Sequence, residues 1–576
     1  MATITEYFEQ AQLSLAAYAL NLTTGISGVA YTDKLKAAGM SSSQAISFAT
    51  AYSVIDQFTD SVTGFSATVF AKGTEMFFAI RGTEPTSISD WLADIDLALG
   101  TGIASNQTLA MYNYFQRLIT PSESQALQVT YVFPTVDEFG NLISPGGLQT
   151  YSVNGLGYIS DPGTIFTVSG HSLGGHLGMA FGRLFGRNVS QLYTYNAPGF
   201  DDASANSFFD QLNAAVGLGP SAYLDDSRST NLYASNGFSL TAGYATTYGT
   251  DVPIFIEEGV FTQNHNIGRL TDSLALYDLF ASIDPALNTP DPAVGIGKIT
   301  DILKASSAQA SSSLERAVDA LVTFFGLEFT PLSDAQIDNR EELYQRIGTL
   351  RALITNLTAN STLVVDSLAN IAATDLANLA QGSTAFGYRY ALRELNPFAI
   401  LGNNDPYALH NQNGELDLYN VADRSGTLTT DWIIDRAKLI YAELLRNTQD
   451  NRDLARLPGT GDIITEYHHY RNGKEEIFFA QAVDSSPGQL PTQVVMFADD
   501  SGRSLVGSDY LLGDRLYGGS NTDYLAGKAG DDYLEGRRGW ISITITFPVT
   551  WESLGRPIAG MVRTPCVIST AKGCCG

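Results

Sequence analysis

The hexapeptide Gly170–Gly175, with Ser172 near its centre, carries the residue types best suited to chemistry. It follows a strand-like run, 164–169, and precedes a helix-like run, 176–185. A serine in such a strand-to-helix turn projects its hydroxyl from the sheet, and glycines fit where larger side chains would collide. The first amides of the helix favour negative charge that develops near the serine. The pattern predicts a nucleophilic serine, against the alternative of a chance glycine-rich turn.

A nucleophilic serine needs a general base, and the chain has six histidines. His265 is the predicted base because it lies in a loop before a helix-like run, 270–280. His171 and His176 sit inside the turn itself and cannot easily face the serine hydroxyl. The alternative for His265 is an ordinary histidine of a surface loop.

The acid that orients the base is expected between the serine and the histidine in chain order. Asp251, which precedes a Val-Pro pair, is the first candidate. The strand-like run 231–234 ends without a carboxylate, although the order of strands would place the acid there. The other candidates are Asp201, Asp202, Asp225 and Asp226.

An oxyanion hole needs two backbone amides. Leu173, directly after the serine, supplies one. The strand-like run 77–81 ends in a tight turn, where the amide and hydroxyl of Thr83 are predicted to face Ser172. The pair Asp90-Trp91 is expected to brace that loop. The alternative is a plain β-turn.

Two successive nonapeptides, 518–526 and 527–535, match the repeat of calcium-binding parallel β-rolls. Asp523 and Asp532 occupy the same place in each. Glycines permit the turns and expose carbonyl oxygens, and aspartates supply the hard anionic oxygens that Ca²⁺ prefers. The alternative is an acidic, glycine-rich loop. The predicted calcium ligands are Asp509, Asp514, Asp523, Asp532, Gly518 and Gly527.

The composition favours a folded protein of several domains. The chain has 576 residues, of which 44% are hydrophobic and 16% charged. Its net charge of −27 opposes binding to a nucleic acid backbone. The N-terminus lacks the basic and apolar segments of a secretory signal. All three cysteines lie in the last eleven residues, so no disulfide framework is expected before them.

The order of strand-like and helix-like runs predicts four regions. Residues 1–285 alternate between the two, which indicates an α/β domain with a mostly parallel sheet and a loop or hairpin inserted at 122–160. Residues 295–480 are predicted to be a mainly helical accessory or lid region, and 503–536 a short parallel β-roll. Within the helical region, apolar stripes at 343–357 and 365–379 predict two amphipathic helices, although 460–500 is more strand-like. The tail, 537–576, has one acidic and five basic residues, and we hypothesise that it is not native sequence.

Together, Arg81-Gly82-Thr83, Asp90-Trp91 and the hexapeptide 170–175 resemble the class 3 lipase family over about residues 60–280. This resemblance implies an α/β-hydrolase fold, with Ser172 as nucleophile and His265 as base. It also implies oxyanion contacts from Thr83 and Leu173. The chain departs from the family at the insertion, and Asp251 comes later than the family's order of strands suggests.

The nonapeptides resemble those of the RTX proteins of Gram-negative bacteria. The resemblance implies structural Ca²⁺ and secretion through a type I exporter without an N-terminal signal peptide. The tail 537–576 does not look like the exporter's usual C-terminal signal.

These observations predict a secreted triacylglycerol lipase that acts at a lipid surface through an acyl-enzyme and uses no organic cofactor. One alternative is a phospholipase A1, which performs the same chemistry on membrane phospholipids. Another is a calcium-dependent surface or adhesion protein with an inactive hydrolase domain.

Overall fold

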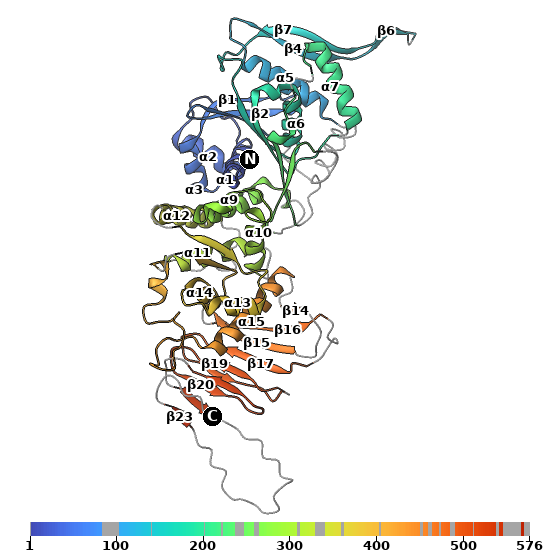
Figure 1. Ribbon diagram of the computed structural model, residues 1–576. Coiled ribbons are helices and arrows are strands. Elements are labelled where there is room, and N and C mark those ends of the chain that lie inside the picture. Colours follow the sequence, from blue (N-terminus) through green and yellow to red (C-terminus); the bar gives the residue numbers. More distant parts are fainter. Residues whose placement is uncertain are drawn as a thin grey trace, which may run out of the picture. The chain divides into compact units, whose positions relative to one another are not determined.

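The computed structural model divides the chain into two compact units (Figure 1). Unit 1 comprises Met1–Gly297 and Ser333–Thr355, and unit 2 comprises Lys298–Leu332 and Asn356–Gly576. The residues that the structure describes are 2–82, 103–139, 141–200, 202–219, 223–236, 247–257, 264–307, 312–328, 340–358, 362–402, 405–449, 453–458, 464–471, 474–483, 490–510, 512–536, 541–544 and 566–568.

Unit 1 is a mixed α/β fold built on one sheet, which among the described residues has seven strands in the order β1-β2-β3-β8-β9-β10-β11. The first three strands are antiparallel, and β3 begins the parallel part. The parallel part fits the predicted α/β architecture because helices connect its strands. The strands are β1 (Ser53–Thr59), β2 (Ser66–Lys72), β3 (Glu75–Ile80), β8 (Phe166–His171), β9 (Val189–Tyr195), β10 (Ser229–Ala234) and β11 (Thr250–Ile254).

Helices cover both faces of this sheet. Successive residues of a strand point to opposite sides and therefore contact helices on opposite faces. On one face, Tyr193 of β9 packs its ring against Tyr7 of the first helix, with centroids 5.9 Å apart. On the other face, Leu192 joins a core cluster with Phe115 and Phe181. The helices of unit 1 are α1 (Ile4–Ala16), α2 (Gly28–Ala37), α3 (Ser42–Ala51), α5 (Ser105–Leu118), α6 (Leu173–Phe185), α7 (Asp202–Val216), α9 (Ile267–Ile283) and α12 (Arg340–Thr358).

Helix α12 packs on α9 through two ion pairs. Arg340 lies 2.7 Å from Asp272, and Arg351 lies 2.5 Å from Asp278. The helix predicted over 343–357 is confirmed, and it belongs to unit 1 although it lies within the region 295–480.

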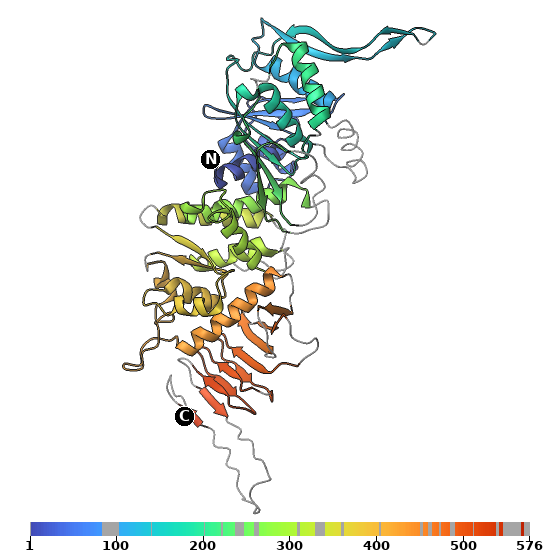
Figure 2. The same cartoon turned by 45° about the vertical axis from the view of Figure 1, so that its right-hand side comes forward.

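The predicted insertion at 122–160 forms a long antiparallel pair, β4 (Gln125–Val132) and β7 (Gly147–Asn154). A shorter pair, β5 (Thr135–Val136) and β6 (Leu142–Ser144), lies between them in sequence. Figures 1 and 2 show this arm extending away from α5 and α7. The expected hairpin is therefore confirmed.

Unit 2 begins with helices and a small two-stranded sheet. The stripe at 365–379 does not form one helix, because its first part, Val364–Ser367, pairs antiparallel with Phe398–Leu401. The strand contains only Val365 of the stripe, and one apolar residue carries no periodicity that could distinguish a strand from a helix. The elements are α10 (Ile296–Ala305), α11 (Ser313–Phe324), β12 (Val364–Ser367), α13 (Ala373–Ala380), α14 (Phe386–Glu394), β13 (Phe398–Leu401) and α15 (Thr430–Thr448).

After α15 the chain winds between two sheets, with orders β14-β16-β15-β17-β19-β21 and β18-β20-β22-β23. From β17 to β22, successive strands alternate between the sheets and pair in parallel with the strand two steps on. The strands are β14 (Leu454–Leu457), β15 (Ile464–Arg471), β16 (Lys474–Ala482), β17 (Gln493–Phe497), β18 (Ser504–Val506), β19 (Arg515–Tyr517), β20 (Asp523–Ala526), β21 (Tyr533–Glu535), β22 (Ile541–Thr544) and β23 (Cys566–Ile568).

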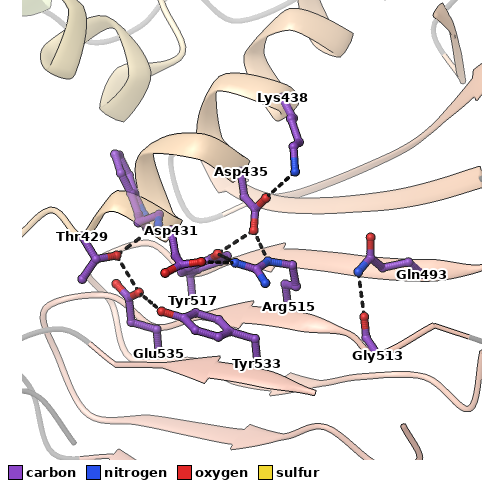
Figure 3. Close-up of polar contacts among 11 residues, drawn as sticks. Thr429, Asp431, Asp435, Lys438, Gln493, Gly513, Arg515, Tyr517, Tyr533 and Glu535 are labelled. Carbon is purple, nitrogen blue, oxygen red and sulfur yellow. Dashed lines mark hydrogen bonds and ion pairs between the residues drawn. The ribbon is translucent and has the colours of Figure 1, made fainter. Parts of the chain in front are cut away.

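Polar contacts attach α15 to these strands (Figure 3). Asp435 accepts hydrogen bonds from Arg515 and from Tyr517, the latter at 2.6 Å. Thr429 donates to Glu535 at 2.7 Å. The regions predicted as 295–480 and 503–536 therefore share contacts within unit 2. Among the described residues, no helix combines the length and apolar character needed to cross a membrane.

Candidate active site

Ser172 lies in the turn between β8 and α6 and has an unusual backbone conformation. Its φ of 57° and ψ of −130° place it in the left-handed region, which costs a non-glycine residue about 1–3 kcal/mol. Its amide donates to the carbonyl of Tyr195 at 2.9 Å, at the end of the neighbouring strand β9. This strained turn at the carboxyl end of a parallel strand has the geometry of a nucleophile elbow.

Glycines make the turn sterically feasible. A Cβ on Gly170 would lie 2.3 Å from the carbonyl oxygen of Gly174, and one on Gly174 would lie 2.3 Å from that of Ile80. A Cβ on Gly82 would lie 2.5 Å from the carbonyl oxygen of His171. Because these neighbours are backbone atoms, they cannot move aside cheaply. The end of β3 therefore packs directly against the turn that holds the serine.

Ser172 is only 1% exposed, and its hydroxyl has no hydrogen-bond partner within the described residues. Leu173 is the first residue of α6, so its amide has no acceptor within the helix. Both observations suit a serine that acts on a bound carbonyl group. The second predicted oxyanion residue, Thr83, and the pair Asp90-Trp91 lie outside the described residues.

His265 lies beside this turn. Its carbonyl accepts a hydrogen bond from Nε2 of His171 at 2.7 Å, and the two imidazole rings are 4.9 Å apart. Nδ2 of Asn196, at the end of β9, lies 3.3 Å from the same carbonyl oxygen. Since His171 directly precedes Ser172, the structure brings the predicted base and nucleophile to one edge of the sheet.

His171, which is not a predicted base, contacts the backbone of the His265 loop and so has a positioning role. Nε2 of His171 carries a proton, because it donates a hydrogen bond to the carbonyl of His265. In neutral His171 the other ring nitrogen, Nδ1, is therefore an acceptor, and the Tyr18 hydroxyl donates to it at 2.8 Å. Burial lowers the pKa of His171 to about 4. Burial, and then the neighbouring His171, lower the pKa of His265 well below its ordinary value of 6.5. A neutral His265 is the form that accepts a proton.

The candidate acids occupy different places. Asp251 is an exposed residue of β11, and its carboxylate accepts from Asn231 at 3.0 Å and from Thr247 at 3.1 Å. Asp225 caps a short 3-10 helix and accepts from Ser227. Asp226 lies in that same helix, whereas Asp201 and the side chain of Asp202 lie outside the described residues. No described contact joins any of these carboxylates to His265.

Glu257, which was not among the predicted acids, is a buried carboxylate that also lies between the serine and the histidine. It follows β11 by three residues, and its backbone carbonyl accepts from Arg269 at 2.9 Å. The available signal was an apolar run, Pro253–Ile256, followed directly by an acid. A triad acid is normally buried, so Glu257 joins Asp251 as a candidate.

The predicted calcium residues lie in unit 2, where Asp523 is the first residue of β20 and the others lie outside the strands. Asp514 and Asp523 are buried, Asp532 is half-buried and Asp509 is exposed. Asp523 accepts from the amides of Arg503 and Gly519, both at 2.7 Å. Burial raises the pKa of Asp523, and these two hydrogen bonds lower it less.

Glycines lie directly beside these carboxylates. A Cβ on Gly518 would lie 2.7 Å from Asp523, and one on Gly527 would lie 2.1 Å from Asp532. Carboxylate and backbone oxygens are the ligand types that suit Ca²⁺. In this structure both carboxylate oxygens of Asp523 accept hydrogen bonds from backbone amides.

A second polar cluster in unit 2 comprises Glu443, His469 and Glu476, whose potential ligand atoms lie within 4.8 Å of one another. Arg446 lies 4.0 Å from both carboxylates. The guanidinium already supplies positive charge to this cluster, which therefore forms an internal ion network.

Comparisons with known proteins place this geometry in context. No family model and no curated relative matches the chain. Among matching solved structures, Lip2 lipase from Yarrowia lipolytica has 17% identity and a TM-score of 0.22, and the match covers 45% of this chain and 82% of that chain. The Rhizomucor miehei lipase propeptide complex has 15% identity and a TM-score of 0.23, with 44% and 68% covered. A triacylglycerol lipase from Penicillium expansum has 17% identity and a TM-score of 0.22, with 44% and 79% covered. TM-scores of this size do not establish a common fold, so the site is interpreted from its own geometry.

Proposed function

We propose that the chain is a serine ester hydrolase that releases fatty acids from acylglycerols. The observation that carries this proposal is the strained, glycine-packed turn that buries the Ser172 hydroxyl beside the loop of His265. The choice of acylglycerols among esters follows from the sequence resemblance to class 3 lipases. Secretion of the protein through a type I exporter is part of the same proposal.

In the proposed mechanism, Ser172 attacks the ester carbonyl and His265 takes its proton. The amides of Leu173 and Thr83 stabilise the oxyanion, and His265 then protonates the departing alcohol. Water, activated by His265, cleaves the acyl-enzyme and releases the fatty acid. His171 and Asn196 would hold the His265 loop in place through its backbone carbonyl.

The decisive experiment measures fatty-acid release from emulsified triacylglycerol at constant pH in calcium. Wild type should release acid, and Ser172→Ala should be slower by at least about 10⁴-fold with an unchanged melting temperature. Labelling of Ser172 by a fluorophosphonate probe tests the nucleophile separately. Labelling without release from triacylglycerol would favour the phospholipase A1 alternative, which phosphatidylcholine as substrate would reveal. Absence of both would favour a binding protein with an inactive hydrolase domain.

The acid is assigned by comparing Asp251→Asn with Glu257→Gln. We expect the true acid variant to lower turnover by about 10⁴-fold, as loss of the orienting carboxylate does in other triads. The other variant then serves as the matched control. If both variants keep full turnover, neither residue orients His265.

We also propose that 503–536 is a parallel β-roll that binds Ca²⁺ through Asp514, Asp523 and Asp532, together with turn oxygens of Gly518 and Gly527. Exposed Asp509 would contribute at the edge of the array. When bound, the ion would neutralise the buried carboxylates of Asp514 and Asp523. Isothermal titration with CaCl₂ should show binding that Asp523→Ala weakens, and equal binding by both proteins would contradict the proposal.

A further inference from the structure

The arm tip, which we define as residues 133–139 and 141–146, exposes four large apolar side chains. Phe133 and Phe139 are 76% and 80% exposed, and Leu142 and Ile143 are 61% and 68% exposed. Figures 1 and 2 show this end of the arm lying farthest from α5 and α7. A concentration of large exposed apolar side chains marks a surface that meets another apolar phase or partner.

The base of the arm is fixed to the core. Ala126 and Val129 of β4 are buried, and Val129 belongs to the main core cluster. The side chain of Asn113, on α5, accepts from the amide of Val129 at 2.7 Å and donates to its carbonyl at 2.8 Å. The arm therefore presents its tip from a defined position.

The end of the tip is an ordered turn. The carboxylate of Asp137 accepts from the amides of Phe139 at 2.9 Å and Asn141 at 2.8 Å. Hydrogen bonds from Asn141 lower the pKa of Asp137, which stays ionised. Phe139 lies in this turn with its ring exposed to solvent.

The apolar residues lie on both faces of the tip. Leu142 and Ile143 are consecutive in β6, so their side chains point to opposite sides of the strand pair. A protein that docked on one face would leave the other face in water. A lipid layer surrounds an inserted tip on every side, so this distribution favours a lipid surface over a protein partner.

The charges select the kind of lipid. Residues 118–182 contain neither lysine nor arginine, and the arm carries the acidic residues Glu123, Asp137 and Glu138. An anionic membrane would repel these charges. A second copy would do so too, because the chain has a net charge of −27. The remaining occupant is an uncharged or zwitterionic lipid surface.

We propose that the arm tip is an anchor that inserts into uncharged or zwitterionic lipid. The inference concerns a surface separate from Ser172 and holds whether or not that serine is a nucleophile. It is tested in the full-length Ser172→Ala protein, so that lipid is not consumed during the measurement.

The experiment measures co-sedimentation with phosphatidylcholine vesicles. The test variant replaces Phe133, Phe139, Leu142 and Ile143 with serine. The matched control replaces four other exposed apolar residues of unit 1 with serine, namely Leu20, Val29, Ile46 and Val62. We expect the test variant to bind at least about 100-fold more weakly, because four apolar side chains no longer leave water, and the control to bind within about 2-fold. Binding to phosphatidylglycerol vesicles should be weaker for all proteins.

A second measurement does not depend on the fourfold variant being folded. In Phe139→Trp, the fluorescence of the added tryptophan is obtained by subtracting the spectrum of the protein without this substitution. It should shift to the blue when phosphatidylcholine vesicles are added. No shift, or equal vesicle binding by the test and control variants, would overturn the anchor. Sedimentation velocity provides a further check. A dimer that forms with the Ser172→Ala protein but not with the test variant would also overturn the anchor, because the tip would then bind a second copy. Vesicle binding without any esterase activity of wild type would refute only the proposed function.

Discussion

The candidate active-site edge of unit 1 and the repeats of unit 2 both bury polar groups, but the hydrogen-bond partners of these groups come from different distances along the chain. Around Ser172, the hydrogen-bonded pairs Tyr18–His171 and His171–His265 are 153 and 94 residues apart. In the repeats, Asp514 bonds to Val494 and Asp523 bonds to Arg503, each 20 residues away, which is one turn of the winding chain. The site is thus one constellation assembled from distant segments, whereas the repeats reuse one local solution. Conditions and substitutions should therefore affect the two units separately.

Acid should destabilise unit 1 selectively, which is the largest effect that we expect. Burial lowers the pKa of His171 and of His176 to about 4, so the unfolded chain binds more protons between pH 6.5 and 4. Stability therefore falls as the pH falls through this window, by about 2 kcal/mol for each histidine from pH 7 to pH 5. Thermal melting of unit 1 at both pH values measures the effect. His176→Gln should remove the share of about 2 kcal/mol that this histidine contributes, while His171 and His265 keep theirs. An unchanged dependence would contradict the prediction.

Asp523→Ala should destabilise the repeats of unit 2 by about 3 kcal/mol in the absence of calcium. It leaves the amides of Arg503 and Gly519 without their buried charged acceptor. Asp509→Ala is the matched control, because Asp509 is exposed and should change stability by less than about 0.5 kcal/mol. Denaturant unfolding followed by far-UV circular dichroism provides the free energies. Comparable losses for both variants would mean that the repeats do not depend on burial of Asp523.

Gly82→Ala should destabilise unit 1 by about 2 kcal/mol and lower esterase turnover. The added Cβ would lie 2.5 Å from the carbonyl oxygen of His171 and 3.2 Å from Cβ of Ser172. Gly348→Ala is the control, because a Cβ there meets nothing within 4 Å and alanine favours the helix by up to about 1 kcal/mol. Melting temperatures and turnover of both variants check this pair. If Gly82→Ala changed neither the melting temperature nor the turnover, the end of β3 would not constrain the serine turn.

Lys528→Gly should stabilise unit 2 by about 1 kcal/mol, the smallest effect expected here. Lys528 has a φ of 71°, in the left-handed region, and it stands where the nonapeptide pattern has glycine. Glycine removes the strain without losing a described contact. Unfolding of unit 2 in urea measures the gain, and a loss of stability would show that the lysine side chain contributes more than its backbone costs.

The sequence alone determined the parts that depend on local patterns. The elbow was predictable because only glycines tolerate the approach of backbone atoms around Ser172, and these glycines are visible in the printed chain. The helix over 343–357 and the arm at 122–160 followed from periodicity and composition. The nonapeptides 518–535 likewise predicted short strands at regular spacing.

Only the tertiary structure decided what distant segments do to one another. Periodicity did not reveal that Val365 pairs in a strand, because the deciding partner, Ile400, lies 35 residues away. The tautomer of His171 depends on Tyr18 and on the backbone of His265, which no local pattern connects. The burial of Glu257, and the exposure of Asp251, likewise depend on packing between segments. Local patterns determine which conformations are accessible, whereas burial and hydrogen-bond pairing depend on contacts that form only when the chain has folded.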